Sequence, residues 1–251
     1  MTNIEKINLV FLPGILADEA LFSHQIENLA DIAHCTVADL TGADNVEALA
    51  TEVLEQAPAT FAMVGFALGG MVALEIMRRA PDRVLALALI STSAHPSTSA
   101  EAANCLSLMN KAEDNFQIVL DQMMPTLLHP SRMEYHSNVT TVYSMGHRTG
   151  KDAFIRQQCA TMNRIDGRPF LLGIACPTLV LCGCDDVLLP LELQVELAAG
   201  IPAADLKILA DAAHFLTIDK PDEVSTLLRS WLARVVAQRL TAATWQCLTT
   251  A

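Results

Sequence analysis

The sequence predicts an α/β fold with a mostly parallel central sheet and helices on both faces. Three observations predict it: short β-rich runs alternate with helical stretches, several of these runs are apolar throughout, and one all-helical stretch interrupts the alternation. Regular strand-helix alternation is typical of a parallel sheet, and strands covered on both faces are continuously apolar. A chain of 251 residues is long enough for one such unit. We therefore expect a single domain over residues 1–251.

Composition and charge narrow the class of protein. Hydrophobic residues make up 52% of the chain and charged residues 18%, which excludes a disordered or fibrous protein. Sixteen Lys and Arg against 28 Asp and Glu give a net charge of −12, so we expect neither nucleic acid nor a membrane surface as a partner. The seven cysteines are scattered without a CxxC pair. With no signal or membrane-spanning stretch recognisable, this favours a cytoplasmic protein with reduced thiols. The oligomeric state is left open.

Each strand and helix is predicted from hydrophobic periodicity and from turn residues. The expected strands cover residues 7–12, 35–38, 60–64, 84–90, 178–181 and 206–209. The expected helices between them cover residues 19–30, 46–56, 68–79, 191–199 and 223–240. In the last helix, Val224, Leu228, Trp231 and Val235 recur at the spacing of a buried stripe.

The alternation stops after Ile90 and resumes at Pro177. The chain between them contains helical stretches without a convincing strand, at residues 106–111, 115–124, 131–143 and 151–163. A helical insertion of this size in an α/β sheet is usually a lid over the strand ends. We expect a cap at about residues 91–174.

The segment from Val64 to Gly70 lies between an expected strand and an expected helix and reads VGFALGG. Glycines at positions 65, 69 and 70 suit a very sharp strand-to-helix turn, because a Cβ there would collide with neighbouring backbone. The residue at the apex, Ala67, is then forced into a strained conformation. This is the G-x-S-x-G nucleophile elbow with alanine in place of serine.

Three further motifs occur in register with this elbow: Leu12-Pro13-Gly14-Ile15, the run from Gly183 to Pro190, and His214 followed by Pro221. With them the chain resembles the α/β-hydrolase superfamily, and within it the small serine esterases, from Ile7 to about Arg239. Each motif is weak alone. Four in order, each near the carboxyl end of an expected strand, are specific, because ligand sites of such sheets form at that edge.

The resemblance implies a nucleophile–acid–histidine triad at Ala67, Asp186 and His214. His214 would act as general base, and Asp186 would hold its tautomer; the exposed neighbour Asp185 is the weaker candidate for the acid. The resemblance also implies an oxyanion hole from the backbone N–H groups of Ile15 and Leu68. Ala213 departs from the family, which usually has Gly before this histidine.

Ala67 is the departure with the largest consequence, because a methyl group cannot attack an acyl carbon. Either this chain is a Ser→Ala inactivated form of a serine hydrolase of small carboxylic esters, thioesters or lactones, or it is a relative that only binds a ligand. We favour the first, since Asp186 and His214 are retained. Two more alternatives stay open: a carbon–carbon bond hydrolase of the same fold, and a cofactor-free enzyme that uses only the His/Asp dyad.

The remaining candidate residues concern the substrate. Phe66 and Phe215 flank two triad positions, Met145 belongs to a methionine-rich insertion that could adapt to an acyl group, and Arg148 could bind a substrate carboxylate. For most methionines and arginines of the insertion, core packing and surface ion pairs are the more ordinary roles. The sequence predicts no metal and no cofactor, and a small ester-type molecule as the partner.

Overall fold

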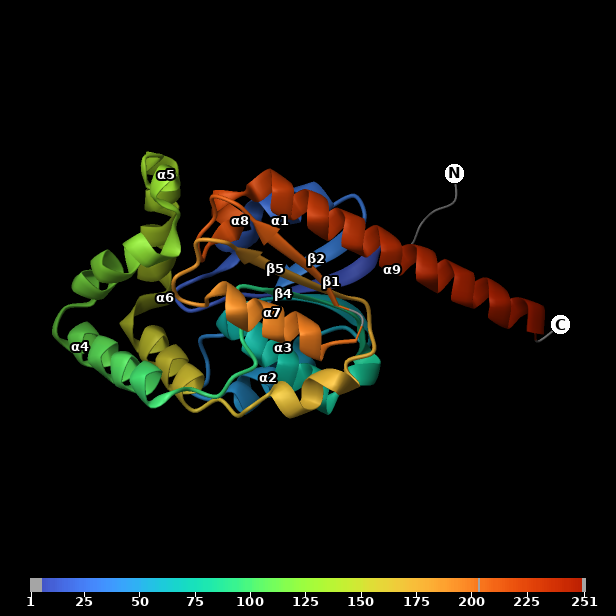
Figure 1. Cartoon of the computed structure of the whole chain (residues 1–251), viewed down its shortest axis with the longest axis horizontal. Coiled ribbons are helices and arrows are strands. Elements are labelled where there is room, and N and C mark those ends of the chain that lie inside the picture. The colour runs from blue at the N-terminus through green and yellow to red at the C-terminus, as the bar shows by residue number, and fades with distance from the viewer. Residues whose placement is uncertain (1–5, 203, 250–251) are drawn as a thin grey trace.

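The computed structural model describes residues 6–202 and 204–249, with side chains up to residue 237. Within them a six-stranded sheet has the order β2-β1-β3-β4-β5-β6, and all its strand pairs are parallel (Figure 1). The predicted strands are confirmed, some with longer bounds. They are β1 (Ile7–Leu12), β2 (Ala33–Val37), β3 (Phe61–Phe66), β4 (Val84–Ile90), β5 (Thr178–Gly183) and β6 (Ala204–Leu209).

Helices cover both faces of the sheet, as the continuously apolar strands predict (Figure 1). One face carries α1 (Ser23–Leu29), the short α8 (Leu216–Asp219) and α9 (Pro221–Thr249), and the other carries α2 (Val46–Gln56), α3 (Leu68–Arg79) and α7 (Leu191–Gly200). Successive strand residues alternate between the two cores: Leu9 and Phe11 pack into one, Val10 and Leu12 into the other. No helix in the described part of the chain is long and apolar enough to cross a membrane.

The helical insertion lies at the carboxyl ends of the strands (Figure 1). It consists of α4 (Ser99–Leu127), α5 (Pro130–Met133) and α6 (His136–Met162). Non-helical backbone at Asn115 and Gly150 interrupts the two long helices. The stretches predicted at residues 106–111 and 115–124 therefore lie in one element, α4, and the stretch predicted at residues 131–143 is divided between α5 and α6. The helix α4 starts earlier than predicted, because the Thr98 hydroxyl and the Glu101 carboxylate form a capping box at its first turn. The short helices η1 (Glu19–Phe22), η2 (Pro81–Arg83) and η3 (Arg168–Gly173) complete the description.

The turn between β3 and α3 consists of one residue, Ala67, with φ 49° and ψ −112°. This left-handed backbone is strained for a residue with a Cβ. The glycines around it are required by close approach. A Cβ on Gly65 would lie 2.6 Å from the carbonyl oxygen of Gly69, one on Gly69 would lie 2.0 Å from that of Leu12, and one on Gly70 would lie 2.4 Å from Thr92 Oγ1. The predicted sharp elbow is therefore confirmed.

We expect Gly69→Ala to lower the free energy of unfolding by about 3 kcal/mol, because the new methyl group can be accommodated only if α3 separates from β1. Urea unfolding followed by circular dichroism measures the loss. Gly173→Ala is the matched control, because a Cβ there meets no atom within 4 Å. Equal midpoints for the two variants would contradict the steric role of Gly69.

Candidate active site

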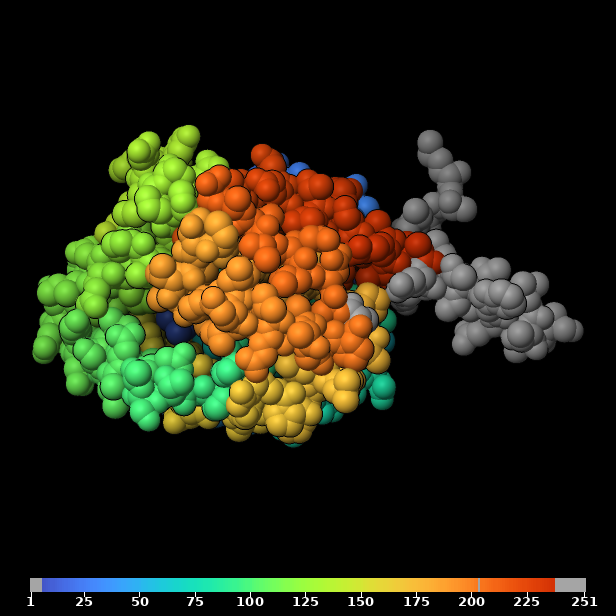
Figure 2. Space-filling model, in the orientation of Figure 1, coloured from blue at the N-terminus to red at the C-terminus, as the bar shows by residue number. Residues whose placement is uncertain are grey.

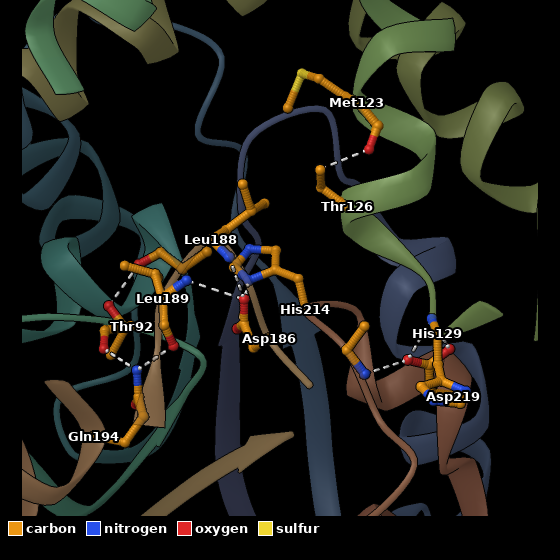
Figure 3. A network of polar contacts seen from close by, with 12 residues as sticks. Thr92, Met123, Thr126, His129, Asp186, Leu188, Leu189, Gln194, His214 and Asp219 are labelled. Carbon is orange, nitrogen blue, oxygen red and sulfur yellow. Dashed lines mark hydrogen bonds and ion pairs between the residues drawn. The ribbon is translucent and has the colours of Figure 1, made fainter. Parts of the chain in front are cut away.

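Asp186 and His214 meet at the carboxyl edge of the sheet, each in the loop that follows a strand (Figure 3). His214 Nδ1 lies 2.8 Å from Asp186 Oδ2, and each residue is only 5% exposed. The other carboxylate oxygen, Asp186 Oδ1, accepts hydrogen bonds from the backbone N–H groups of Leu188, at 2.9 Å, and Leu189, at 3.0 Å. The carboxylate is therefore held by three donors in one orientation.

The protonation of this pair follows from its surroundings. Burial acts most strongly on Asp186 and raises its pKa, but the adjacent His214 and the N–H groups of Leu189 and Leu188 together outweigh it, so the pKa of Asp186 lies below its ordinary value of 3.8. An ionised carboxylate can only accept hydrogen bonds, so Nδ1 of His214 carries the proton. The lone pair of the neutral imidazole is then on Nε2, where it can act as a general base.

The elbow and the Pro13-Gly14 turn adjoin this pair. The ring of Phe66, the residue before the apex, lies 4.9 Å from the His214 ring between centroids. A Cβ on Gly14 would lie 2.8 Å from the Phe66 ring and 3.2 Å from the Cβ of Ala67. One place in the fold thus brings together the imidazole, the elbow and the turn before Ile15.

Backbone N–H groups are available at this place. The residue before α3, Ala67, has no side chain that could cap the helix, whereas Asn45 caps α2 by accepting from the N–H of Ala48 at 2.8 Å. Across residues 6–202 and 204–249, the N–H groups of Ile15 and Leu68 donate to no protein acceptor. The positive end of the helix dipole adds to the Leu68 donor. These two groups can therefore stabilise an anionic oxygen.

A buried amide from the cap holds the backbone beside Ile15. Leu16 has a left-handed φ of 59°, and its N–H donates to Gln157 Oε1 of α6 at 3.1 Å. The same side chain donates from Nε2 to the carbonyl oxygen of Leu40 at 3.2 Å. Gln157 therefore fixes the turn that presents the Ile15 N–H group, a role that the sequence analysis did not identify.

Two polar side chains behind the elbow hold its carbonyl group (Figure 3). Thr92 Oγ1 donates to the carbonyl oxygen of Ala67 at 2.7 Å, and Gln194 Nε2 donates to the carbonyl oxygen of Thr92 at 2.7 Å. Both side chains are fully buried. They stabilise the strained residue at the apex, and the sequence analysis did not identify them either.

The segment that carries His214 is tied to the cap. Asp219, fully buried in α8, accepts from the N–H of Ala213 at 2.8 Å and from that of His129 at 3.1 Å. The N–H of Phe215 donates to the carbonyl oxygen of Leu127 at the end of α4, at 2.7 Å. Hydrogen bonds on both sides of His214 thus join its loop to the connection between α4 and α5 (Figure 3).

We expect Asp219→Ala to lower the free energy of unfolding by about 2–3 kcal/mol, because it leaves two backbone N–H groups without an acceptor. Asp219→Asn should cost less, because its amide oxygen can still accept and because burial raises the pKa of Asp219, so the charge itself is held at a cost. Urea titrations of both variants test this order. If Asp219→Asn lowered the free energy of unfolding as much as Asp219→Ala does, the charge of Asp219, rather than its role as an acceptor, would stabilise the loop.

The predicted substrate residues have different surroundings. Phe66 and Phe215 are buried against each other, with centroids 5.4 Å apart, and Met145 is fully buried in the core. Arg148 is exposed and pairs with Asp18, its Nε 2.7 Å from Oδ2. Asp185, the weaker candidate for the acid, is half-exposed and lies 3.8 Å from His129. Substrate contact by Phe66, Phe215, Met145 and Arg148 stays a prediction.

Beneath the cap and beside Leu16 lies a small apolar cavity of about 10 Å³, bounded also by Met123, Met124 and Tyr143. This volume holds at most one water molecule. Figure 2 shows a hollow between α4 and the segment that follows β5, with atoms of the N-terminal part of the chain, in dark blue, at its base.

The residue before His214 departs from the expected glycine, and its effect can be judged from the backbone angles. The non-glycine residues of the described chain with positive φ are Leu16, Ala67, Ser91 and Asp211. Ala213 is not among them, so alanine before His214 introduces no strain. No cluster of three or more His, Cys, Asp or Glu side chains within the described residues could hold a metal ion.

The comparisons with known proteins agree with the fold. The sequence model described as "Alpha/beta hydrolase family" matches residues 9–227. A RutD protein of Agrobacterium fabrum, named for carbamate hydrolysis, is 27% identical over 250 residues, which cover 92% of this chain and 95% of that protein. The RutD protein of Serratia proteamaculans is 28% identical over 68% of this chain and 65% of its own length. A thermophilic esterase from Thermogutta terrifontis superposes with a TM-score of 0.83 at 23% identity, over 91% of this chain and 90% of that structure.

Proposed function

Since the chain belongs to the alpha/beta hydrolase family, we propose that its site is built to hydrolyse a small carboxylic ester, thioester or lactone, and that Ala67 removes the acyl-enzyme step. The observation that carries the proposal is the buried Asp186–His214 pair, 2.8 Å apart. A buried histidine that is hydrogen-bonded to a carboxylate beside a strained turn is costly to keep without a function. The names of two relatives, an esterase and a carbamate hydrolase, fit attack on a carbonyl carbon.

In the complete reaction, His214 would take a proton from a hydroxyl group at position 67 while its oxygen bonds to the substrate carbonyl carbon. The carbonyl oxygen then gains negative charge and is stabilised by the N–H groups of Ile15 and Leu68. Collapse of this tetrahedral intermediate expels the alcohol, which receives the proton from His214. Water repeats the sequence on the acyl-enzyme. Each role except that of the hydroxyl has a suitable group in this chain.

We propose that the acyl group enters the small cavity beneath the cap, whose lining includes Leu16, the residue after the Ile15 donor. Its volume of about 10 Å³ leaves no room for a long chain unless Met123 and Met124 move. We therefore propose acetyl and propionyl esters as better substrates than octanoyl esters. Rates of the Ala67→Ser variant on p-nitrophenyl esters of increasing acyl length test this order, and a rate that rises with chain length would contradict it.

A second candidate is hydrolysis or proton abstraction by the dyad alone, and the methyl side chain of Ala67, which has no hydroxyl group, favours it. Because the imidazole keeps a free Nε2, His214 could take a proton from water, whose oxygen then attacks the carbonyl carbon directly. The chain with Ala67 would show slow ester hydrolysis that His214→Ala abolishes. A background rate unchanged by His214→Ala would exclude the dyad and leave ligand binding as the function of the Ala67 chain.

A further inference from the structure

A larger cavity, of about 350 Å³, lies away from the elbow, the dyad and the oxyanion turn. It is enclosed by α3, by the segment Ser93–His95 that follows β4, and by residues 164–174, which include η3. None of the residues assigned to catalysis or to substrate lines it. Its volume lies within the range of pockets that bind small molecules, so it requires an explanation separate from that of the active site.

Most of the cavity wall is apolar. Its apolar side chains come from α3 and from the segment before β5. They include Met71, Leu74, Met77, Ile165, Leu171 and Ile174. Two of them are methionines, whose thioethers adapt to irregular apolar shapes. Phe170 also lines the cavity and is partly exposed. Such a wall suits a hydrocarbon chain or an aromatic ring.

Two guanidinium groups, those of Arg78 and Arg164, line the cavity together with the Glu75 carboxylate and the His95 imidazole. Arg78 binds the buried Glu75 carboxylate through Nε and Nη2, at 2.8 and 2.7 Å, and its guanidinium lies 5.7 Å from the Phe170 ring centroid. Among the described residues, Nη1 of Arg78 donates to no protein acceptor. The Nη1 group of Arg78 is therefore available to donate to a ligand near the Phe170 ring.

The second cation, Arg164, is buried and already has one anionic partner. Its side chain is 6% exposed, and its Nη2 donates to Glu101 Oε2 at 3.4 Å. Backbone carbonyl oxygens of His95 and Thr161 accept from Nε and Nη1. Burial, the strongest influence, lowers the pKa of Arg164, and the Glu101 carboxylate acts in the opposite direction. A second carboxylate in the cavity would lower the cost of holding this buried cation.

We propose that this cavity is a second ligand site, which binds a small amphipathic carboxylate with its apolar body against Met71 and Met77 and its carboxylate at Arg78 and Arg164. The ligand class follows from the two features together. An apolar molecule would take water away from Nη1 of Arg78 without supplying an acceptor, and a small polar anion would leave the methionine-lined wall in contact with water. Because Glu75 occupies Nε and Nη2 of Arg78, the carboxylate would accept a charge-assisted hydrogen bond from Nη1.

The methionines allow the site to be located in solution. Octanoate is titrated into protein labelled with ¹³C at the methionine methyl groups, and resonances are assigned by Met→Leu variants. Met71 and Met77 report on this cavity, whereas Met123 and Met124 report on the one beneath the cap. We expect saturable shifts of Met71 and Met77, and binding weaker by about tenfold or more for octan-1-ol, which lacks the charge.

Two neighbouring variants test the cation. Arg78→Gln should raise the Kd for octanoate by about tenfold or more, whereas Arg79→Gln should leave it unchanged, because Arg79 does not line the cavity and binds Glu47 and Thr51 instead. Shifts confined to Met123 and Met124, or none up to millimolar octanoate, would overturn the proposal. Equal binding of octan-1-ol in the unaltered chain would do the same and needs no variant.

Discussion

Ala67→Ser is expected to raise kcat for p-nitrophenyl acetate by at least about 10³-fold, and by up to about 10⁶-fold, since removal of a triad nucleophile costs about 10⁶ and leaves 10³ to 10⁴ over water. The reason is geometric. The strained backbone of Ala67, φ 49° and ψ −112°, is already the one in which a nucleophile elbow presents its side chain. Only the oxygen atom has to be added.

Steady-state kinetics of both proteins, with a burst of p-nitrophenol in the serine variant, measures the effect. The control is Ala67→Cys, whose thiol can also form an acyl-enzyme but whose acyl intermediate should accumulate to a different extent. Equal rates for the Ala and Ser chains, both above background, would contradict the acyl-enzyme route and favour the dyad. Inactivity of both on the whole ester panel would instead indicate a binding protein or an unrelated substrate class.

Asp186→Asn in the Ala67→Ser background is expected to lower kcat by about 10⁴-fold. An asparagine can keep the bonds from Leu188 and Leu189 if its amide oxygen takes the place of Oδ1. Its NH₂ group then faces Nδ1 of His214, which must become the acceptor, so the proton moves to Nε2. An imidazole protonated on Nε2 cannot accept the proton of the serine hydroxyl.

The control is Asp185→Asn, one residue earlier and 47% exposed at its side chain, which should leave kcat within about twofold. Circular dichroism shows whether both variants fold. A comparable loss in both variants would mean that the negative charge of the loop, rather than the Asp186 hydrogen bond, supports catalysis.

The same carboxylate predicts a pH dependence of stability. The pKa of Asp186 in the folded chain lies below its ordinary value of 3.8, so ionised Asp186 stabilises the fold above that value, and this contribution is lost as the pH falls through the folded pKa. Ionisation of Asp219 has the opposite effect on stability, because burial raises the pKa of this carboxyl group. Since the contribution of Asp186 is lost below its ordinary pKa of 3.8, the acid transition should weaken in Asp186→Asn, an effect measurable by urea unfolding from about pH 5 down to about pH 2.

The sequence was informative where the pattern is local. Apolar runs predicted each strand of the described sheet, and the glycines at 65, 69 and 70 predicted a turn as tight as the one observed. The predicted start of a helix differs from the observed one where a capping side chain sets the boundary. The helix α4 begins at Ser99, and the Thr98–Glu101 capping pair that starts it was present in the sequence but was not used.

The supporting residues could not be predicted because their partners are distant along the chain. Gln157 acts on Leu16 across 141 residues, and Gln194 acts on Thr92 across 102. A glutamine in a helix carries no signal that it faces a backbone group of another segment. The cavity beside α3 was missed for the same reason, since its cations, Arg78 and Arg164, come from different elements and each has an ordinary surface role in the sequence.

The hydrogen bonds of Asp219 and Phe215 to the α4–α5 connection have a consequence for access. If the cap moved outward at this connection, these hydrogen bonds would pull the His214 loop with it. His214 would then leave the position in which it can act as the general base. We therefore expect any opening of the cap at the α4–α5 connection to be coupled to displacement of the catalytic histidine.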